Sequence, residues 1–171
     1  MVNGLGGYIE ALNVGVGAAS GRLCFTADAD TVNHVLSEGE TQVDVVDVPV
    51  HSLDDLLADR RPTIMKIDVE GYESYVLEGA EAVLNRPDLL AIIIELNGSG
   101  KRYGVDDVGI HQKLLSKGFE TFRYAPFERR LLPLHGGRSA SSNTLYVRGA
   151  NALGERVKGS RSYRIGNGAV L

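Results

Sequence analysis

The chain contains little sulfur and no tryptophan: 171 residues include one cysteine, Cys24, and two methionines. A single cysteine excludes an internal disulfide framework and a cysteine-rich zinc site, and it favours the reducing cytoplasm. No run of about 18 apolar residues is present, so no segment is predicted to span a membrane. The start has no charged stretch followed by an apolar one, so no signal peptide is indicated. We therefore expect a cytoplasmic protein without a membrane partner.

Proline is also scarce, with 5 residues, whereas 21 glycines indicate a chain rich in turns. A hydrophobic fraction of 43% suits a globular domain and excludes collagen, coiled coil and disorder. The length is enough for one domain with a core and short for two. We predict a single domain over residues 1–148. Residues 149–171, rich in glycine and arginine, are expected to form a tail or an added edge strand.

The net charge of −4 conceals a strong asymmetry along the chain. Residues 1–50 carry −6, residues 51–100 carry −6 and residues 101–171 carry +8. The basic last part could bind a polyanion, or it could pair with the acidic parts within the fold. Aromatic residues are not interleaved with the basic ones, as a stacking platform for nucleic acid requires. We favour pairing within the fold and expect no nucleic-acid partner.

The first third of the chain predicts extended structure followed by a short helix. The expected strands are residues 9–16, 21–26 and 41–50, with a hairpin turn over 18–21 between the first two. Pro49 suggests that the third strand ends there or lies at an edge. Ser52 is expected to cap a short helix that runs through Leu57.

From Thr63 onward, strands and helices alternate. The expected elements are a strand over 63–69, a helix over 72–84 with Glu73, Glu78 and Glu81 away from its apolar face, a strand over 89–96, a helix over 106–117, and strands over 119–124 and 144–147. Residues 89–96 (LLAIIIEL) are almost entirely apolar, which is typical of a strand buried on both faces of a parallel sheet. This alternation indicates an α/β sheet with right-handed crossovers.

Two glycine-containing segments look like phosphate-binding loops. Gly15, Gly17 and Gly21 follow a strand, but a nucleotide loop must open a helix, and the next residues (RLCFT) favour a strand. We interpret this segment as a hairpin turn. Residues 98–101 (GSGK) lack the other residues of a P-loop, so we reject that motif.

Polar side chains follow two neighbouring strands of the predicted sheet. Asp68 and Glu70 lie at the carboxyl end of the 63–69 strand, and Glu95 and Asn97 close the 89–96 strand. Open α/β sheets place their ligand crevice at this end. One interpretation is a functional cleft formed by these four candidate residues. The other is that Lys66 forms an internal salt bridge with one carboxylate while the others cap helices. Because two neighbouring strands end alike, we favour the cleft.

Metal binding is a lesser alternative. The four histidines are scattered, with no i,i+4 pair that could hold zinc. Asp68, Glu95 and Asn97 offer oxygen ligands that suit a hard cation. We nevertheless predict no metal centre.

The segment KIDVEGYE, residues 66–73, resembles the FkbM-type methyltransferases, which are S-adenosylmethionine-dependent enzymes of the Rossmann-like class. Other segments are also similar to this family: residues 13–17 (NVGVG), 48–56 (VPVHSLDDL), 75–80 (YVLEGA), 92–96 (IIIEL), 117–120 (KGFE) and 143–147 (NTLYV). The resemblance covers roughly residues 9–148.

The resemblance implies a class I methyltransferase sheet that is Rossmann-like and truncated at its N-terminus. This sheet would be mostly parallel, with antiparallel strands at the C-terminal end. It also implies O-methylation of a small-molecule or sugar hydroxyl with S-adenosylmethionine as cofactor. The resemblance implies the site but not each role; we predict Asp68 and Glu70 as the catalytic residues, with Asp68 nearest the reacting centre and Glu70 orienting substrate or cofactor. Glu95 and Asn97 would line the acceptor side.

The matched region lacks the family's glycine-rich cofactor loop and the acidic residue that ends the following strand. We therefore assign no cofactor-binding residue and expect the isolated chain to be nearly inactive. The alternative function is a non-catalytic remnant that acts as a homo-oligomeric or interaction module. Because the truncated sheet would expose an edge, we expect a homodimer or larger assembly, with the apolar residues of 9–16 covered.

Overall fold

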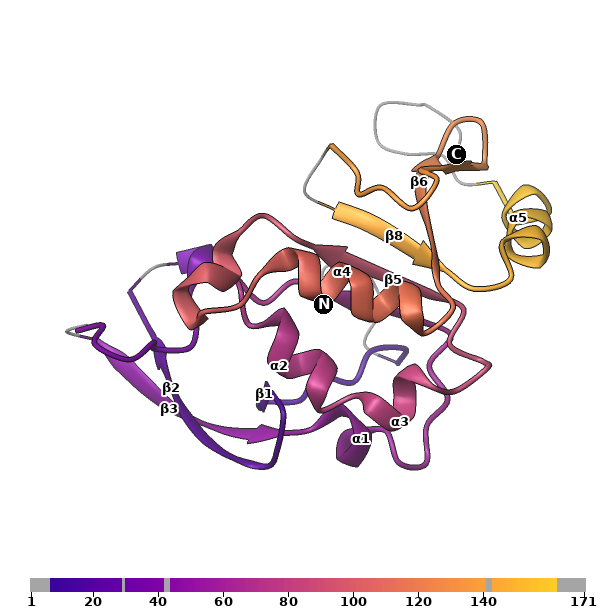
Figure 1. Cartoon of the computed structure of the whole chain (residues 1–171). Coiled ribbons are helices and arrows are strands. Elements are labelled where there is room, and N and C mark those ends of the chain that lie inside the picture. Colours follow the sequence, from indigo (N-terminus) through magenta and orange to yellow (C-terminus); the bar gives the residue numbers. More distant parts are fainter. Residues whose placement is uncertain (1–6, 29, 42–43, 141–142, 163–171) are drawn as a thin grey trace.

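The computed structural model describes residues 7–28, 30–41, 44–140 and 143–162 and contains two sheets (Figure 1). The smaller sheet has the strand order β1-β3-β2, with β1 at Gly15–Val16, β2 at Gly21–Thr26 and β3 at Val45–His51. The larger sheet has the order β4-β5-β8-β6-β7. Its strands are β4 (Ile64–Ile67), β5 (Ala91–Glu95), β6 (Glu120–Ala125), β7 (Arg130–Pro133) and β8 (Asn143–Val147).

A strand–helix–strand unit forms the first half of the larger sheet. Strands β4 and β5 are parallel neighbours, in register from Ile64 beside Ala91 to Ile67 beside Ile94. The chain between them forms helices α2 (Glu73–Glu78) and α3 (Glu81–Leu84). The expected α/β class is confirmed, as is the prediction that these two strands are adjacent and parallel.

The single helix expected over residues 72–84 is instead interrupted at Gly79. A Cβ atom on Gly79 would lie 2.0 Å from the carbonyl oxygen of Gly17, because the chain after β1 crosses here. Helix α3 then begins anew, with the backbone N–H groups of Ala82 and Val83 each donating to the Asp54 carboxylate over 2.9 Å. A long-range contact therefore divides a segment whose local pattern is helical throughout.

Parallel pairing is confined to two strand pairs among the described residues. Strand β5 pairs antiparallel with β8, and β6 pairs antiparallel with both β8 and β7. The expected antiparallel strands at the C-terminal end are thus confirmed. Antiparallel pairs make up most of the larger sheet among the described residues, so this sheet is less parallel than expected. Strand β7 was not expected from the sequence pattern.

The smaller sheet corrects the expected hairpin over residues 18–21. Strand β1 pairs parallel with β3, and β2 lies antiparallel on the other side of β3. Only Gly15 and Val16 of the expected strand over 9–16 are in strand conformation. Pro49 lies inside β3, but pairing with β1 starts only at Val50. Proline has no backbone N–H group, but no hydrogen bond to β1 is lost at Pro49, because the pairing with β1 begins at the next residue.

Three further α-helices are present among the described residues. Helix α1 (Leu53–Leu56) is capped as expected, because the Ser52 hydroxyl accepts a hydrogen bond from the Asp55 N–H over 3.1 Å. Helix α4 (Asp107–Ser116) follows the cap Asp106. Helix α5 (Ala150–Lys158) corrects the expected tail or edge strand over residues 150–158. No helix of the described residues is long and apolar enough to cross a membrane.

The main core lies between one face of the larger sheet and the helices that follow β4 and β5 (Figure 1). Its fully buried side chains include Leu77, Leu84, Ile92, Ile94 and Leu114. Helix α5 belongs to a second, smaller cluster, in which Leu153 joins Ala91, Phe122 and Val147. The apolar positions of α5 explain its helical state, because they bury against a sheet surface that the sequence pattern alone does not reveal.

Charges from different parts of the chain meet within the fold. The Glu81 carboxylate pairs with Lys113 over 2.6 Å and with Lys117 over 2.5 Å. A further pair, Asp107 with Arg138 over 3.0 Å, lies within the last third itself. The acidic middle of the chain thus neutralises part of the basic last third, as the favoured interpretation of the charge asymmetry requires.

Candidate functional site

The carboxyl ends of β4 and β5 lie at the same edge of the larger sheet. The last paired residues are Ile67 and Ile94, and the next residues are Asp68 and Glu95. The Asp68 carboxylate forms an ion pair with the Lys66 ammonium, and its side chain is 41% exposed. The topology therefore places both carboxylates at the predicted position. The ion pair between Lys66 and Asp68 is the internal salt bridge that the alternative interpretation predicted.

The loop after β4 touches the loop after β5 at Gly71. Gly71 has φ of +100°, and a Cβ atom there would lie 2.6 Å from the carbonyl carbon and oxygen of Ser99. Real Cβ atoms do not approach backbone this closely, so only glycine permits the contact. Glu70 also has a positive φ, +51°, which ends the alternation of side chains that runs along the strand. The two strand-end loops are therefore in direct backbone contact at Gly71.

Glu73 has a structural role that the sequence analysis missed. It was expected away from the apolar face of the helix, but it is buried, with 5% of its surface exposed. Its carboxylate accepts hydrogen bonds from the backbone N–H groups of Gly71 (3.2 Å) and Val69 (3.4 Å). Burial raises the pKa of Glu73 above its usual value of 4.5, against the opposing effect of these hydrogen bonds. Glu73 thus braces the loop that carries Asp68 and Glu70; its only signal in the sequence is its place at the end of KIDVEGYE.

The other two candidate residues are engaged locally. The Asn97 side-chain oxygen accepts hydrogen bonds from the Ser99 backbone N–H (3.0 Å) and hydroxyl (2.5 Å), which start the short 3-10 helix η2 (Ser99–Tyr103). Glu95 is half-buried and lies opposite Asn143 of β8. Within the described part of the chain, no hydrogen bond or ion pair joins Asp68 or Glu70 to Glu95 or Asn97. The strand ends are together, and the assignment of the four residues to one cleft stays a prediction.

The described ranges contain no group of three or more His, Cys, Asp or Glu residues placed to hold a metal ion. His111 has structural partners instead: its Nδ1 lies 2.8 Å from the Tyr146 hydroxyl, and its Nε2 lies 3.0 Å from the Gly136 carbonyl oxygen.

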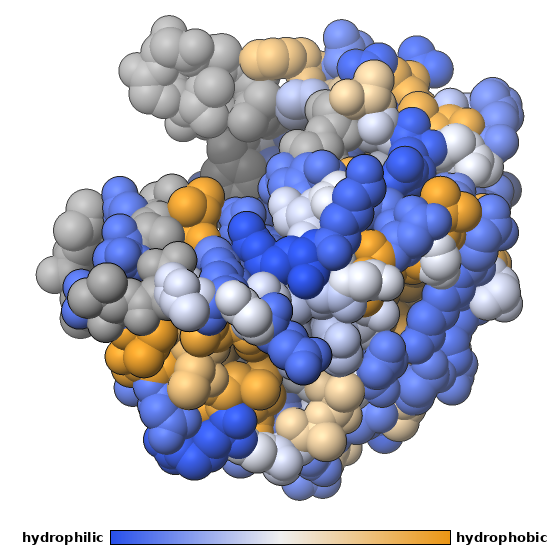
Figure 2. Space-filling model, turned by 60° about the vertical axis from the view of Figure 1, so that its left-hand side comes forward, coloured by the Kyte–Doolittle hydropathy of each residue, from blue (hydrophilic) through white to orange (hydrophobic). Residues whose placement is uncertain are grey.

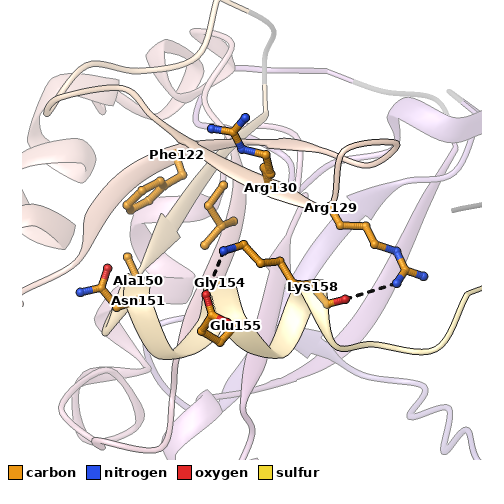
Figure 3. Close-up of a pocket in the computed structure, with 9 residues that line it drawn as sticks. Phe122, Arg129, Arg130, Ala150, Asn151, Gly154, Glu155 and Lys158 are labelled. Carbon is orange, nitrogen blue, oxygen red and sulfur yellow. Dashed lines mark hydrogen bonds and ion pairs between the residues drawn. The ribbon is translucent and has the colours of Figure 1, made fainter.

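A pocket of about 370 Å³ lies between β7 and α5, away from the strand ends (Figure 3). Two of the three cationic side chains that line it, Lys158 and Arg129, have partners. Lys158 pairs with Glu155 over 2.9 Å, and the Arg129 guanidinium donates to the Ser160 carbonyl oxygen over 2.7 Å. The Lys158–Glu155 pair lies within α5, whereas Arg129 joins the end of α5 to the turn before β7. We therefore attribute the pocket to structure.

A second pocket, of about 360 Å³, adjoins the strand-end loops and is lined by aromatic side chains. Tyr72 and Tyr75 stack with ring centroids 4.5 Å apart, and the Tyr103 ring meets Tyr72 edge-on at 5.2 Å. Tyr72 follows Gly71, and Tyr103 ends the helix that starts at Ser99. The contact between the two loops therefore also assembles this aromatic cluster.

The sequence matches the family model of the methyltransferase FkbM domain over residues 2–121. This chain belongs to the FkbM methyltransferase domain family. The matched region includes β4, the KIDVEGYE segment and β5, so the two strand ends lie within it. The resemblance seen in the sequence is confirmed, and with it the Rossmann-like α/β class.

No curated protein sequence matches the chain. The structure is similar to the crystal structure of methyltransferase FkbM from Methylobacillus flagellatus KT, with a TM-score of 0.49 and 18% sequence identity. The similarity covers 85% of this chain, which spans 30% of the length of that protein.

The FkbM methyltransferase family is generally S-adenosylmethionine-dependent, but the described residues do not fit a complete site for this cofactor. The glycine-containing turn after β1 leads into a strand, so it offers no free N–H groups of a helix start to a carboxylate. A Cβ atom on Gly17 would contact the side chains of Val50 at 3.0 Å and Tyr72 at 3.4 Å. This turn therefore packs against the protein and does not open around a ligand.

Proposed function

We propose that this chain supplies the acceptor-binding side of an S-adenosylmethionine-dependent O-methyltransferase site, which acts on a small-molecule or sugar hydroxyl. Membership of the FkbM methyltransferase domain family supports methyl transfer in general. The observation that supports the proposal most is the contact between Gly71 and Ser99, because it joins the loops that follow β4 and β5. A cytoplasmic location fits the single exposed cysteine, Cys24.

In this proposal, the four candidate residues have different roles. Asp68 is partly exposed and accepts the proton of the acceptor hydroxyl, while Lys66 fixes the direction of its carboxylate. Glu70 follows on the same loop and orients the acceptor. Glu95 and Asn97 line the acceptor side from the end of β5.

We propose that the isolated chain binds S-adenosylmethionine too weakly for turnover at cellular concentrations. Loss of a charged contact to the ribose alone costs about 1.5–3 kcal/mol, or roughly 10- to 150-fold in affinity. Titration calorimetry should therefore show no saturation at micromolar cofactor. Low-micromolar binding with one-to-one stoichiometry would overturn this part of the proposal.

Activity is tested at millimolar cofactor, which compensates for weak binding. We expect slow formation of S-adenosylhomocysteine with a panel of sugar and small-molecule alcohols. Asp68→Asn should abolish this residual transfer, whereas Tyr124→Ala, a change at an exposed position on β6, should not. If the wild-type chain forms no product, or if Asp68→Asn is as active as the wild type, the methyltransferase proposal fails.

A second candidate function, a homo-oligomeric interaction module, is favoured by the free edge of β4. This strand is the outermost of its sheet among the described residues, and Ile64 on it is 56% exposed. An apolar groove of about 290 Å³ runs along it, bordered by Val16, Leu53, Leu57, Pro62 and Val76. A strand edge of this kind is a template for pairing with another chain.

We propose a second copy of this chain as the occupant, because the two charges that flank the end of β4, on Lys66 and Asp68, are self-complementary. An antiparallel pair of β4 strands centred on Ile67 places Lys66 opposite Asp68 of the second copy, and the reverse. In sedimentation velocity, Lys66→Glu should weaken the dimer, and Lys66→Glu combined with Asp68→Lys should restore it. A wild-type chain that stays monomeric well above micromolar concentrations, or a double variant that is not restored, would refute this assembly.

A further inference from the structure

The aromatic cluster beside the strand-end loops has the form of a ligand platform. Its three rings come from two segments: Tyr72 and Tyr75 lie at the start of α2, and Tyr103 ends η2. All three side chains are partly exposed, and all three line the same pocket. Rings that served only the core would be fully buried, so these rings retain surface that a ligand can cover.

The polar groups around the rings are arranged for a neutral, hydroxyl-bearing ligand. The Tyr103 hydroxyl is fixed, because it donates to the Val35 carbonyl oxygen over 2.6 Å. The hydroxyls of Tyr72 and Tyr75 form no hydrogen bond with any described residue. The exposed side chains of Arg102 and Glu38 also line the pocket, one as a donor and the other as an acceptor.

Burial raises the pKa values of the Tyr72 and Tyr103 phenols above 10, so both stay neutral near pH 7. A neutral phenol can both donate and accept a hydrogen bond. The pocket volume, about 360 Å³, lies near the lower end of the range for small-molecule sites and suits a single ring.

We propose that Tyr72, Tyr75 and Tyr103, with Arg102 and Glu38, bind one neutral sugar ring of the acceptor. A sugar ring carries an apolar C–H face, which the tyrosine rings cover, and hydroxyls around its rim, which meet the polar groups. A flat aromatic ligand would also stack, but it would offer no ring of hydroxyls to Arg102 and Glu38. The role of this ring as methyl acceptor rests on the proposed function, whereas its binding does not require the cofactor.

Ligand binding at this site can be followed by the intrinsic fluorescence of the unmodified chain, because the chain contains seven tyrosines and no tryptophan. Its intrinsic fluorescence is therefore tyrosine fluorescence, to which the cluster contributes three of the seven side chains. Titration with methyl α-D-glucopyranoside, without cofactor, should change this fluorescence saturably. For a ligand of this size at about 0.3 kcal/mol per heavy atom, the expected Kd is on the order of 1 mM.

Three variants make the test specific. Tyr75→Ala should weaken binding roughly five- to tenfold, the effect of losing one aromatic contact, whereas Tyr75→Phe should keep most of it. Tyr124→Ala is the matched control, because it removes a tyrosine that is 43% exposed on β6 and lies outside the pocket. Circular dichroism checks that each variant is folded, and saturation-transfer NMR of the sugar provides a second readout.

The proposal is overturned if the sugar causes no saturable change, or if Tyr75→Ala and Tyr124→Ala bind it equally. Titration with phenol is the second arm: phenol binding without sugar binding would assign the pocket to an aromatic ligand and also overturn the proposal. Failure of the proposed function looks different, because sugar binding would persist while methyl transfer at millimolar cofactor was absent.

Discussion

Replacement of Gly71 by alanine tests the contact that joins the two strand-end loops. Two separate costs are expected. A residue with a Cβ atom at φ of +100° costs about 1–2 kcal/mol. The Cβ atom would also lie 2.6 Å from the Ser99 carbonyl group and 2.9 Å from the Gly100 nitrogen, so backbone must move. Overpacking of this kind costs about 1–3 kcal/mol.

The sum for Gly71→Ala is about 2–5 kcal/mol, which corresponds to a fall in Tm of about 4–20 °C for a chain of this size. Gly98→Ala is the matched control. Gly98 has a similar φ of +87°, but no atom lies within 4 Å of its Cβ position. This variant carries the conformational cost alone, so the difference between the two variants isolates the contact between the loops.

Thermal and urea unfolding of both variants, followed by circular dichroism, measure this difference. We expect Gly71→Ala to be less stable than Gly98→Ala by about 1–3 kcal/mol. It should also reduce sugar binding, since Tyr72 follows Gly71 directly. Equal losses of stability in the two variants would show that the loops are not in contact, and the argument for a shared surface would fail.

Three further predictions follow from single positions. Gly79→Ala should destabilise the fold by about 1–3 kcal/mol or more, because its Cβ atom would meet the Gly17 carbonyl oxygen. Gly109→Ala, in an open part of α4, should instead stabilise the fold by about 0.5–1 kcal/mol. Urea unfolding measures both changes, and similar effects of the two variants would contradict the crossing at Gly79. Because the pKa of Glu73 is raised by burial, the folded state holds this proton more tightly than the unfolded state, and wild-type stability should fall as pH rises from about 4.5 through the higher folded pKa. Glu73→Gln should lack this loss, so its stability relative to the wild type should increase across that window in denaturation curves; parallel pH profiles would argue against a buried carboxylate. Asp68→Asn breaks an exposed ion pair and should cost at most about 1 kcal/mol of stability while changing ligand behaviour, whereas a loss of about 3–5 kcal/mol, as for a broken buried pair, would make Asp68 a structural residue.

Much of the secondary structure, and the position of the candidate site, could be predicted from local patterns. The apolar runs that end at Ile67 and Glu95 predict two neighbouring strands, and the structure pairs them in parallel. Ser52 and Asp106 start helices, because their side chains accept backbone hydrogen bonds within the next three residues. The polar residues at the two strand ends could be placed at one edge of the sheet, because the carboxyl ends of parallel strands meet there.

The sequence by itself therefore determined the features that depend on neighbours within a few residues: the periodicity of each element, its caps and the chemistry of its ends. Tertiary structure decided what depends on segments distant in the chain. The approach of Gly17 divides a helical pattern at Gly79, and a second apolar cluster makes α5 a helix. Local pattern treated Glu73 as a solvent-facing position of a helix, but the folded loop buries it against the N–H groups of Val69 and Gly71. The three-tyrosine cluster depends on both levels: Tyr72 and Tyr75 are neighbours at the start of one helix, but Tyr103 meets them only where the two loops touch at Gly71, a residue without a side chain.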